Sequence, residues 1–445
     1  MKEDVTEAQQ KFWLDSIKLI ARLIIGLIVW LTAVVVIAVI IISSRLYDFS
    51  SFEVLLGLVA TLAAVGGAWL IYPLKSELKT LRQAIVDRTR AASLTGVEQR
   101  NVFHDRVDKH FSSITVDAYR KLGGLTIDKL SRINLFAGIN NSGKTTLLEA
   151  VYLLTRQNDF DGLVEVIHRR GKISHDQIDP EWFMAQISNE IRVGGVFDHR
   201  PGGISVRVRE ETEADLDKSR YLGSVEIGAE FVDVRQESVT RVFKGRDRET
   251  QAGSIRLLCP IVYSSPFFLN EPQRYASFYE ESIKSKSLPK IIEFIRKEIL
   301  PTLNDIRLVD KRQRFLVDDD NFSSSLDLTN YGEGLQRIFF ISLLFASAAN
   351  GVVLIDEFEN AIHTELIGRF SGFIHKLAET FNVQVFLTSH SKECIDAFVK
   401  KAPNPDDFSC YALVPSDGTI SVREFTGGKF QRLLELGDVD LRRAR

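Results

Sequence analysis

The segment "GINNSGKT", from Gly138 to Thr145, decides the fold class of this chain. It fits the pattern G-x-x-x-x-G-K-[ST], in which glycines let backbone N–H groups curl around phosphate oxygens. The apolar run "INLFAG" leads into it, and the apolar run "TTLLEAVYLL" follows it. This order of strand, loop and helix predicts a phosphate-binding loop (P-loop), to which the N-terminus of the helix adds the positive end of its dipole.

The residues of this loop have predicted roles. We expect Lys144 to bridge the β- and γ-phosphates of a bound nucleotide and Thr145 to coordinate Mg²⁺ through its hydroxyl. ATP is favoured over GTP because the chain has no N-K-x-D motif to recognise a guanine base. The predicted nucleotide-binding residues of the loop are Gly138, Asn140, Asn141, Ser142, Gly143, Lys144, Thr145 and Thr146.

A second motif, "VVLIDEFE", ends an apolar strand in two carboxylates. Asp356 is placed to hold Mg²⁺, directly or through a water, and Glu357 is placed to polarise the attacking water. An acidic pair at the end of a strand is usually structural when it stands alone. Behind a P-loop, with a predicted helix between the two motifs, it indicates hydrolysis of ATP.

Three motifs follow the P-loop in the order "GEGLQR", "LIDEFENAIH" and "LTSHS". This order resembles the ABC-type ATPase superfamily, and within it the OLD-like (overcoming lysogenisation defect) branch of bacterial ATPases. The resemblance covers roughly Ser113 to Phe425, although the inserted region is matched only in size. It implies that His390 contacts the γ-phosphate, because ABC-type ATPases keep a histidine at this place. Without the resemblance, a histidine after a strand is more often a surface or core residue.

The resemblance also implies a second copy of the chain. In the superfamily, two ATPase domains enclose two ATP molecules, each between the P-loop of one subunit and the signature loop of the other. Gly332, Glu333 and Gly334 look like the signature backbone. The segment "ENAIH", from Glu359 to His363, looks like the part that crosses the dimer interface.

The predicted signature loop departs from the family pattern at its serine. The place of that serine falls on Tyr331 or Gly332, and neither has a short hydroxyl group. We therefore expect backbone N–H groups, and the positive end of a helix that begins near Leu335, to meet the γ-phosphate.

Two further features of the expected nucleotide site stay open. A glutamine that senses Mg²⁺ is implied by the resemblance, and Gln157, Gln177 and Gln186 all qualify. Tyr119 could stack on adenine from a strand before the P-loop, but an aromatic residue at such a place is more often part of the core.

Two uncharged stretches near the start of the chain predict a membrane hairpin. Residues 23–44 and 54–74 contain no charged side chain, and each is long enough to cross a bilayer as a helix. A cleaved signal peptide has a shorter apolar core and would leave the second stretch unexplained, and a buried soluble hairpin is the other alternative. Basic residues flank the hairpin on its outer sides, which predicts an inner-membrane protein with both termini and the ATPase domain in the cytoplasm. These residues are Lys11, Lys18, Arg22, Lys75, Lys79 and Arg82.

The predicted fold class is α/β, an ABC-ATPase-like P-loop domain with inserted antiparallel strands, preceded by an α-helical transmembrane hairpin. The expected organisation is a hairpin over 1–78, a stalk over 79–112, the ATPase domain over 113–430 with its insert at about 162–254, and a tail over 431–445. Within the domain, "LPKIIEFIRKEIL" predicts an amphipathic helix. A second helix is expected to stop at Gly351, before a buried strand.

The cysteines and the C-terminal segment do not indicate a further activity. Cys259, Cys394 and Cys410 are scattered and lack the spacing of a zinc site, so we expect reduced thiols. OLD-like nucleases often carry a C-terminal Toprim domain, but the chain after His390 is too short for one. The "DVD" at Asp438 to Asp440 is therefore expected to be a solvated tail, and nuclease activity is not expected.

Basic residues in the insert alternate with apolar ones and leave two interpretations open. They could present a basic sheet face to nucleic-acid phosphates, or they could be the exposed face of a half-buried sheet with interspersed glutamates. The second interpretation is favoured. The residues are Arg207, Arg209, Arg235, Arg241, Lys244, Arg246 and Arg248.

These observations predict a membrane-anchored ATPase that acts as an ATP-dependent dimerisation switch. By analogy with OLD-like ATPases that lack a nuclease, it would be a sensor or regulator in a bacterial antiphage defence system, acting with a companion effector protein. The alternative is a protein that tethers nucleic acid at the membrane under the control of ATP. A transporter is disfavoured, because two spans are few for a translocation path.

Overall fold

The computed structural model of this chain describes residues 101–102, 107, 109–171, 179–187, 189–210, 220–231, 234–245, 248–252, 255–264, 272–309, 314–359, 364–416, 419–437 and 439–443. All of them belong to one compact unit that extends from Arg100 to Arg445. The predicted membrane spans, residues 23–44 and 54–74, lie outside the described residues. No helix within the described ranges is both long enough and apolar enough to cross a bilayer.

The central sheet carries the predicted P-loop. Within the described residues its six strands stand in the order β11 (Ile261–Ser264), β15 (Val352–Ile355), β16 (Gln384–Ser389), β4 (Ile133–Ala137), β17 (Phe408–Ser416) and β18 (Thr419–Thr426). Neighbouring strands are parallel, except that β18 is antiparallel to β17. β4, β15 and β16 are buried along their whole length, as their continuous apolar sequences predict for strands that are covered on both faces.

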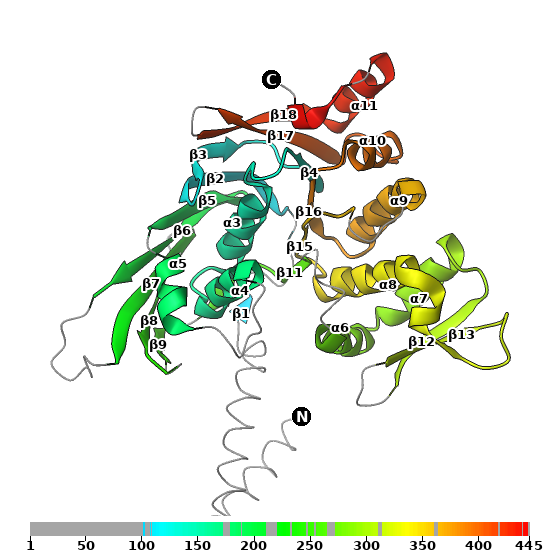
Figure 1. Cartoon of the computed structure of the whole chain (residues 1–445), viewed down its shortest axis with the longest axis horizontal. Coiled ribbons are helices and arrows are strands. Elements are labelled where there is room, and N and C mark those ends of the chain that lie inside the picture. Colours follow the sequence, from blue (N-terminus) through cyan, green and yellow to red (C-terminus); the bar gives the residue numbers. More distant parts are fainter. Residues whose placement is uncertain are drawn as a thin grey trace, which may run out of the picture. The chain divides into compact units, whose positions relative to one another are not determined.

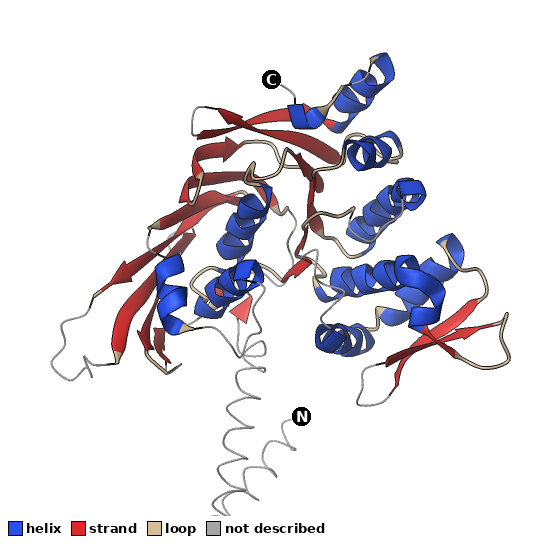
Figure 2. Ribbon diagram, viewed as in Figure 1, coloured by secondary structure: helices blue, strands red, loops and turns tan. Residues whose placement is uncertain are grey.

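Helices cover both faces of this sheet (Figures 1 and 2). On one side lie α3 (Lys144–Arg156) and α4 (Phe160–Gly171), and on the other lie α8 (Gly332–Ser347), α9 (Thr364–Thr380) and α10 (Lys392–Lys400). Side chains alternate between the two cores with the period of a strand. Leu354 and Phe386 belong to the core that contains α3, whereas Ile355 and Leu387 belong to the core that contains α8 and α9.

A second sheet packs on the other side of α3 and α4 (Figure 1). In the described part of the chain it has seven antiparallel strands, in the order β3 (Leu122–Ile127), β2 (Phe111–Tyr119), β5 (Ile191–Phe197), β6 (Arg200–Arg209), β7 (Tyr221–Phe231), β8 (Val234–Phe243) and β9 (Arg248–Ala252). The antiparallel strands expected in the insert are therefore present. They do not form a separate sheet, because β5 pairs with β2, which precedes the P-loop.

The first part of the predicted insert is helical, so the expectation of strands alone was wrong there. α4 begins at Phe160 and buries Leu163, Val166 and Ile167, whose i, i+3, i+4 spacing places them on a single face. α5 (Pro180–Gln186) follows, and Asp179 caps it by accepting hydrogen bonds from two backbone N–H groups. A short pair, β1 (Asn101–Val102) with β10 (Arg256–Leu257), completes this region.

A subregion of helices and short strands lies beside α8. It contains α6 (Pro272–Lys284), α7 (Leu288–Glu298), the strands β12 (Leu303–Val309), β13 (Arg314–Asp319) and β14 (Leu326–Asp327), and the 3₁₀ turn η4 (Leu328–Tyr331). The amphipathic helix predicted from "LPKIIEFIRKEIL" is confirmed as α7. α8 begins at Gly332, earlier than the expected start near Leu335, and it ends at Ser347, before Gly351.

Both ends of the predicted ATPase domain need correction. The domain begins earlier than residue 113, because β1 pairs with β10, and Phe111 is buried. The predicted tail is ordered and packed: α11 (Gly427–Leu436) and η5 (Leu441–Arg443) extend past residue 430, and Leu441 is buried. Moving the apolar side chain of Leu441 out of water lowers the free energy of the folded protein. This burial holds the segment against the domain.

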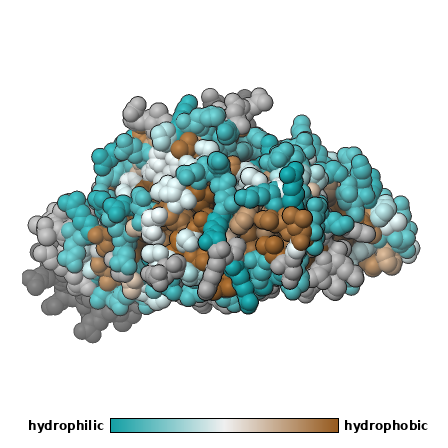
Figure 3. Space-filling model, turned by 90° about the horizontal axis from the view of Figure 1, so that it is seen from above, coloured by the Kyte–Doolittle hydropathy of each residue, from teal (hydrophilic) through white to brown (hydrophobic). Residues whose placement is uncertain are grey.

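The face shown in Figure 3 is mainly hydrophilic, with hydrophobic side chains gathered toward its middle. Among the described residues, the large hydrophobic side chains that are clearly exposed come from several different elements. Exposed apolar side chains of this kind are normal on a protein surface.

Gly351 tests how closely the start of β15, the strand that precedes Asp356, packs against the backbone of Pro260. A Cβ atom there would lie 1.9 Å from the carbonyl oxygen of Pro260, which accepts a hydrogen bond from Val352. We expect Gly351→Ala to destabilise the protein by about 2 to 3 kcal/mol, because backbone must move to accommodate the methyl group. Gly372→Ala is the matched control: its Cβ meets open space inside α9, so it should stabilise by up to about 1 kcal/mol. Thermal melting of the two variants measures both effects, and a Gly351→Ala protein that melts like the wild type would contradict this reading.

Candidate functional site

The predicted P-loop joins the end of β4 to the start of α3, as the sequence indicated. Gly143 stands at the N-cap of α3 with φ of 88°, a left-handed conformation that favours glycine. Asn140 and Asn141 are exposed, whereas Gly138 and Ser142 are buried. The hydroxyl of Ser142 has no hydrogen-bond partner among the described residues.

Lys144 folds back over the loop that precedes it. Its Nζ donates hydrogen bonds to the carbonyl oxygens of Gly138 and Ile139, each at 2.9 Å. Burial lowers the pKa of this lysine, and the nearby carboxylates of Asp356 and Glu357 oppose that shift. The ammonium group is therefore held inside the loop, where a phosphate would be cradled.

Thr145 and Asp356 are neighbours at the carboxyl edge of the central sheet, although they are far apart in the sequence. Thr145 Oγ1 donates a hydrogen bond to Asp356 Oδ2 at 2.9 Å. Thr388, at the end of β16, donates to the other carboxylate oxygen at 2.5 Å. Burial raises the pKa of Asp356 to about 6, and the hydrogen bonds from the two threonines act against this rise.

Glu357 and His390 lie at the same edge of the sheet. Glu357 has φ of 47°, and its backbone N–H donates to Thr388 Oγ1 at 2.8 Å. Its carboxylate is 35% exposed, and Glu357 Oε1 lies 3.7 Å from His390 Nδ1. The carboxylate that is predicted to polarise water is thus accessible, whereas Asp356 is buried.

His390 is held by residues whose roles the sequence analysis did not identify. Glu359 Oε1 accepts hydrogen bonds from the backbone N–H of His390 and from Ser389 Oγ, and it lies 3.2 Å from His390 Nδ1. Arg442 donates to the carbonyl oxygen of His390 at 2.9 Å and is itself paired with Asp440. Glu359 was assigned by resemblance to a dimer interface, and residues 360–363 of that segment lie outside the described residues.

An ion pair between a buried glutamate and a partly exposed arginine joins α3 to α4. Glu149, in α3, accepts hydrogen bonds from Tyr119 Oη and from Arg170 of α4. Arg170 also donates to Thr146 Oγ1 at 2.7 Å, which ties α4 to the first turn of α3. Tyr119 is only 3% exposed, so it belongs to the core and is not free to stack on adenine. No sequence pattern pointed to Arg170.

None of the glutamine candidates that the structure describes reaches the site. Gln157 is buried at the C-terminal end of α3, and about 20 Å of helix separates it from the P-loop. Gln186 is exposed at the end of α5, and Gln177 lies outside the described residues. The expected glutamine therefore stays unassigned.

The structure does not bring the predicted signature residues to the P-loop of the same chain. Gly332, Glu333 and Gly334 form the first turn of α8, which lies across the central sheet from α3 (Figure 1). Gly332 is exposed and has φ of 78°. Gly334 lines a cavity together with residues of α7 and α9.

Most of the basic residues of the insert that the structure describes have acidic neighbours. Arg207 pairs with Glu190, Arg241 lies 4.0 Å from Glu249, Lys244 lies 3.5 Å from Glu181, and Arg248 lies 3.1 Å from Asp161. Arg246 lies outside the described residues. These pairs favour the interpretation of an ordinary exposed sheet face.

Comparisons with curated proteins give two informative relatives. An ATP/GTP phosphatase of Helicobacter pylori is 19% identical over 366 residues, which span 73% of this chain and 97% of that protein. The DNA replication and repair protein RecF of Azotobacter vinelandii is 35% identical over 97 residues, which span 21% of this chain and 26% of that protein.

Among solved structures, the SMC head domain from Thermotoga maritima is similar with a TM-score of 0.36 and 13% identity, covering 71% of this chain and 99% of that chain. A family model described as "AAA domain, putative AbiEii toxin, Type IV TA system" matches residues 133–396, more than half of the chain. That match begins with β4 and the P-loop and continues past His390, so it contains the P-loop and the motifs around Gly334, Asp356 and His390. The chain belongs to this AAA family and is a P-loop ATPase.

Proposed function

We propose that ATP binds at the loop from Gly138 to Thr146 and is hydrolysed at the carboxyl edge of the central sheet. The observation that carries the proposal is the 2.9 Å hydrogen bond between Thr145 Oγ1 and Asp356 Oδ2. It places the hydroxyl of the P-loop beside the carboxylate at the end of β15. This is the arrangement in which P-loop ATPases hold a divalent cation next to the β- and γ-phosphates.

The residues present fit Mg²⁺. A threonine hydroxyl and an aspartate carboxylate supply two of the oxygen ligands that this ion prefers, and phosphate and water oxygens can supply the others. Bound there, Mg²⁺ would neutralise charge that develops on the phosphates during transfer. Thr388 keeps the carboxylate of Asp356 in place by donating to its second oxygen.

The remaining roles fall to Glu357, His390 and Lys144. Glu357 is exposed enough to accept a proton from the attacking water, and its backbone is fixed by Thr388. His390, whose backbone N–H is bound by Glu359, is available to donate a side-chain hydrogen bond to the γ-phosphate. Lys144 lies within the loop and would exchange its two carbonyl partners for phosphate oxygens.

The complete site is proposed to need a second copy of the chain. Gly332, Glu333 and Gly334 begin a helix, so their backbone N–H groups are free to bind an anion at the positive end of its dipole. Within one chain this helix and α3 lie on opposite sides of the sheet (Figure 1). A partner subunit would bring its α8 against the P-loop, which makes ATP a ligand that closes the dimer.

The wider role that we propose is a membrane-anchored switch in bacterial antiphage defence, related to the OLD-like ATPases. The uncharged stretches 23–44 and 54–74 support anchoring in the inner membrane, with the ATPase domain in the cytoplasm. The family description, which names an AbiEii toxin of a type IV TA system, supports a defence role, whereas the companion effector protein rests on the resemblance to OLD-like ATPases alone. Tethering of nucleic acid is the weaker alternative, because the insert's basic residues are largely paired.

Glu357→Gln tests the proposed hydrolysis. Removing the general base should lower ATP turnover by about 100-fold or more while ATP still binds and holds the dimer closed. Glu435→Gln, an exposed residue of α11, is the matched control and should hydrolyse ATP normally. Phosphate release and size-exclusion chromatography with ATP measure the two effects. Normal turnover in Glu357→Gln would exclude the proposed role.

Gly334→Asp tests the signature helix. The added carboxylate would repel the partner's γ-phosphate, so turnover should fall about ten-fold or more and the dimer should no longer close. ATP binding to the isolated subunit should change little, because Gly334 does not belong to the P-loop. Gly334→Asn has the same size without the charge and should retain more activity. Equal, undiminished turnover in both variants would show that this helix is not part of the site.

A further inference from the structure

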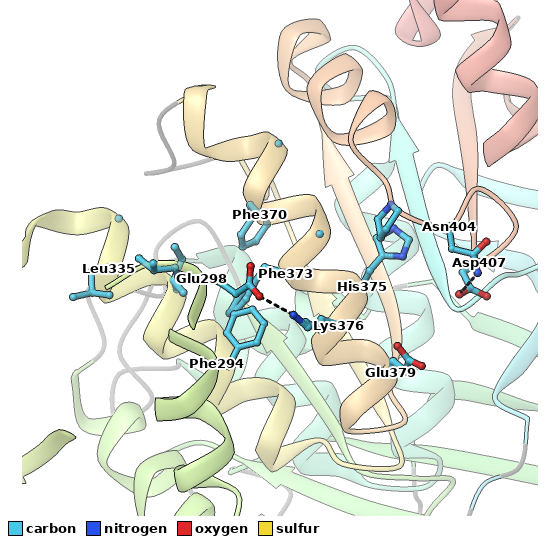
Figure 4. Close-up of a pocket in the computed structure, with 16 residues that line it drawn as sticks. Phe294, Glu298, Leu335, Phe370, Phe373, His375, Lys376, Glu379, Asn404 and Asp407 are labelled. Atoms are coloured by element: carbon cyan, nitrogen blue, oxygen red, sulfur yellow. Dashed lines mark hydrogen bonds and ion pairs between the residues drawn. The ribbon is translucent and has the colours of Figure 1, made fainter. Parts of the chain in front are cut away.

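A cavity of about 680 Å³ lies between α7, α8, α9 and the loop around Asn404 (Figure 4). Its volume is in the range of sites that bind small organic molecules. It is separate from the P-loop, because residues 138–146 do not line it. The start of α8, from Gly334 to Ile338, forms one of its walls.

Aromatic side chains form much of the apolar wall of the cavity. The ring centres of Phe294 and Phe373 lie 4.4 Å apart, and Leu335 also lines the cavity (Figure 4). Gly372 leaves a gap in the wall, since a Cβ atom there would have no neighbour within 4 Å. An apolar or aromatic group can therefore enter without moving the protein backbone.

This wall already holds one cation. Lys376 Nζ lies 5.4 Å from the centre of the Phe294 ring and donates a hydrogen bond to Glu298 at 2.7 Å. An ammonium group above an aromatic face and beside a carboxylate is a favourable arrangement. A cationic ligand could pair with a carboxylate in the same way, because Glu379 and Asp407 also line the cavity.

The charges that line the cavity favour a positive ligand. Among its described lining residues, Glu298, Glu379 and Asp407 are acidic, and only Lys376 is basic at neutral pH. His375 does not offset them: burial lowers its pKa to about 4, against the opposing charge of Asp407, so it is neutral.

His375 supplies a second observation that points to a ligand. Its side chain lines the cavity and is 93% buried, being 7% exposed, against the rings of Phe398 and Phe408. Its Nε2 atom has no hydrogen-bond partner among the described residues. A buried polar atom without a partner is costly, and a ligand N–H group that reached this nitrogen would remove that cost.

We propose that this cavity binds a small organic cation, an ammonium or guanidinium group carried on an apolar or aromatic body. The cation would lie among Glu379, Asp407 and His375, and the apolar body would fill the space beside Gly372 and Phe373. Because Gly334 and Leu335 line the same cavity, an occupant long enough to reach that end of it would contact the first turn of α8. Any effect of the ligand on ATP turnover rests on the proposed role of that turn, whereas binding does not.

Fluorescence titration with dansylcadaverine tests the proposal. This probe joins a naphthalene ring to a primary ammonium through a flexible chain, and its emission rises when the ring leaves water. The matched probe, dansyl-6-aminohexanoate, carries a carboxylate in place of the ammonium. We expect the full-length protein, without nucleotide, to bind dansylcadaverine saturably and the anionic probe roughly ten-fold more weakly or worse.

Variants locate the binding in this cavity. Gly372→Leu fills the open space beside the aromatic wall and should weaken binding of dansylcadaverine by roughly ten-fold, whereas Gly372→Ala should leave it nearly unchanged. Glu379→Gln should also weaken binding, and Glu435→Gln, which does not line the cavity, should not. Equal affinity for the two probes, or full binding by Gly372→Leu, would overturn the proposal. Since no nucleotide is present, failure of the two-subunit ATP site would leave these results unaffected.

Discussion

The hydrogen bond between Thr145 and Asp356 depends on one constraint, the parallel order of β15, β16 and β4. Parallel strands end at the same edge of a sheet, so the residues that follow them become neighbours whatever their distance in the sequence. Thr388, from the strand between the other two, donates to Asp356 and also accepts from the backbone of Glu357. The three strand ends thus form a connected group, and displacing any strand would separate the P-loop from its carboxylates.

Much of this edge could be predicted because the chemistry lies in short motifs. The P-loop, the acidic pair at Asp356 and Glu357, and the position of His390 each follow an apolar run that forms a buried strand. The supporting contacts could not be predicted in the same way. Arg442 reaches His390 from the end of the chain, and Arg170 reaches Thr146 from the next helix, so no local spacing reveals either contact.

Tertiary packing also overrode local interpretations elsewhere. The C-terminal segment looked like a solvated tail because its sequence is charged, but Leu441 anchors it to the core. For Tyr119 the two interpretations were stacking on a base and core packing; core packing was favoured, and the residue is buried against Glu149. The start of α8 was placed too late, because Gly332 and Gly334 are poor helix formers in isolation, whereas the helix that follows them is deeply buried.

The proposed ATP site is divided between two chains, and one experiment tests that division. Lys144→Ala should disable the P-loop and Gly334→Asp the signature helix, so each variant alone should keep at most about a tenth of the wild-type turnover. Mixed together, they should form heterodimers in which one site keeps both intact halves, restoring about a quarter of the wild-type turnover per subunit after random pairing. A mixture that stays inactive although heterodimers form would contradict the shared site, and full activity of Gly334→Asp alone would show that a single chain completes it.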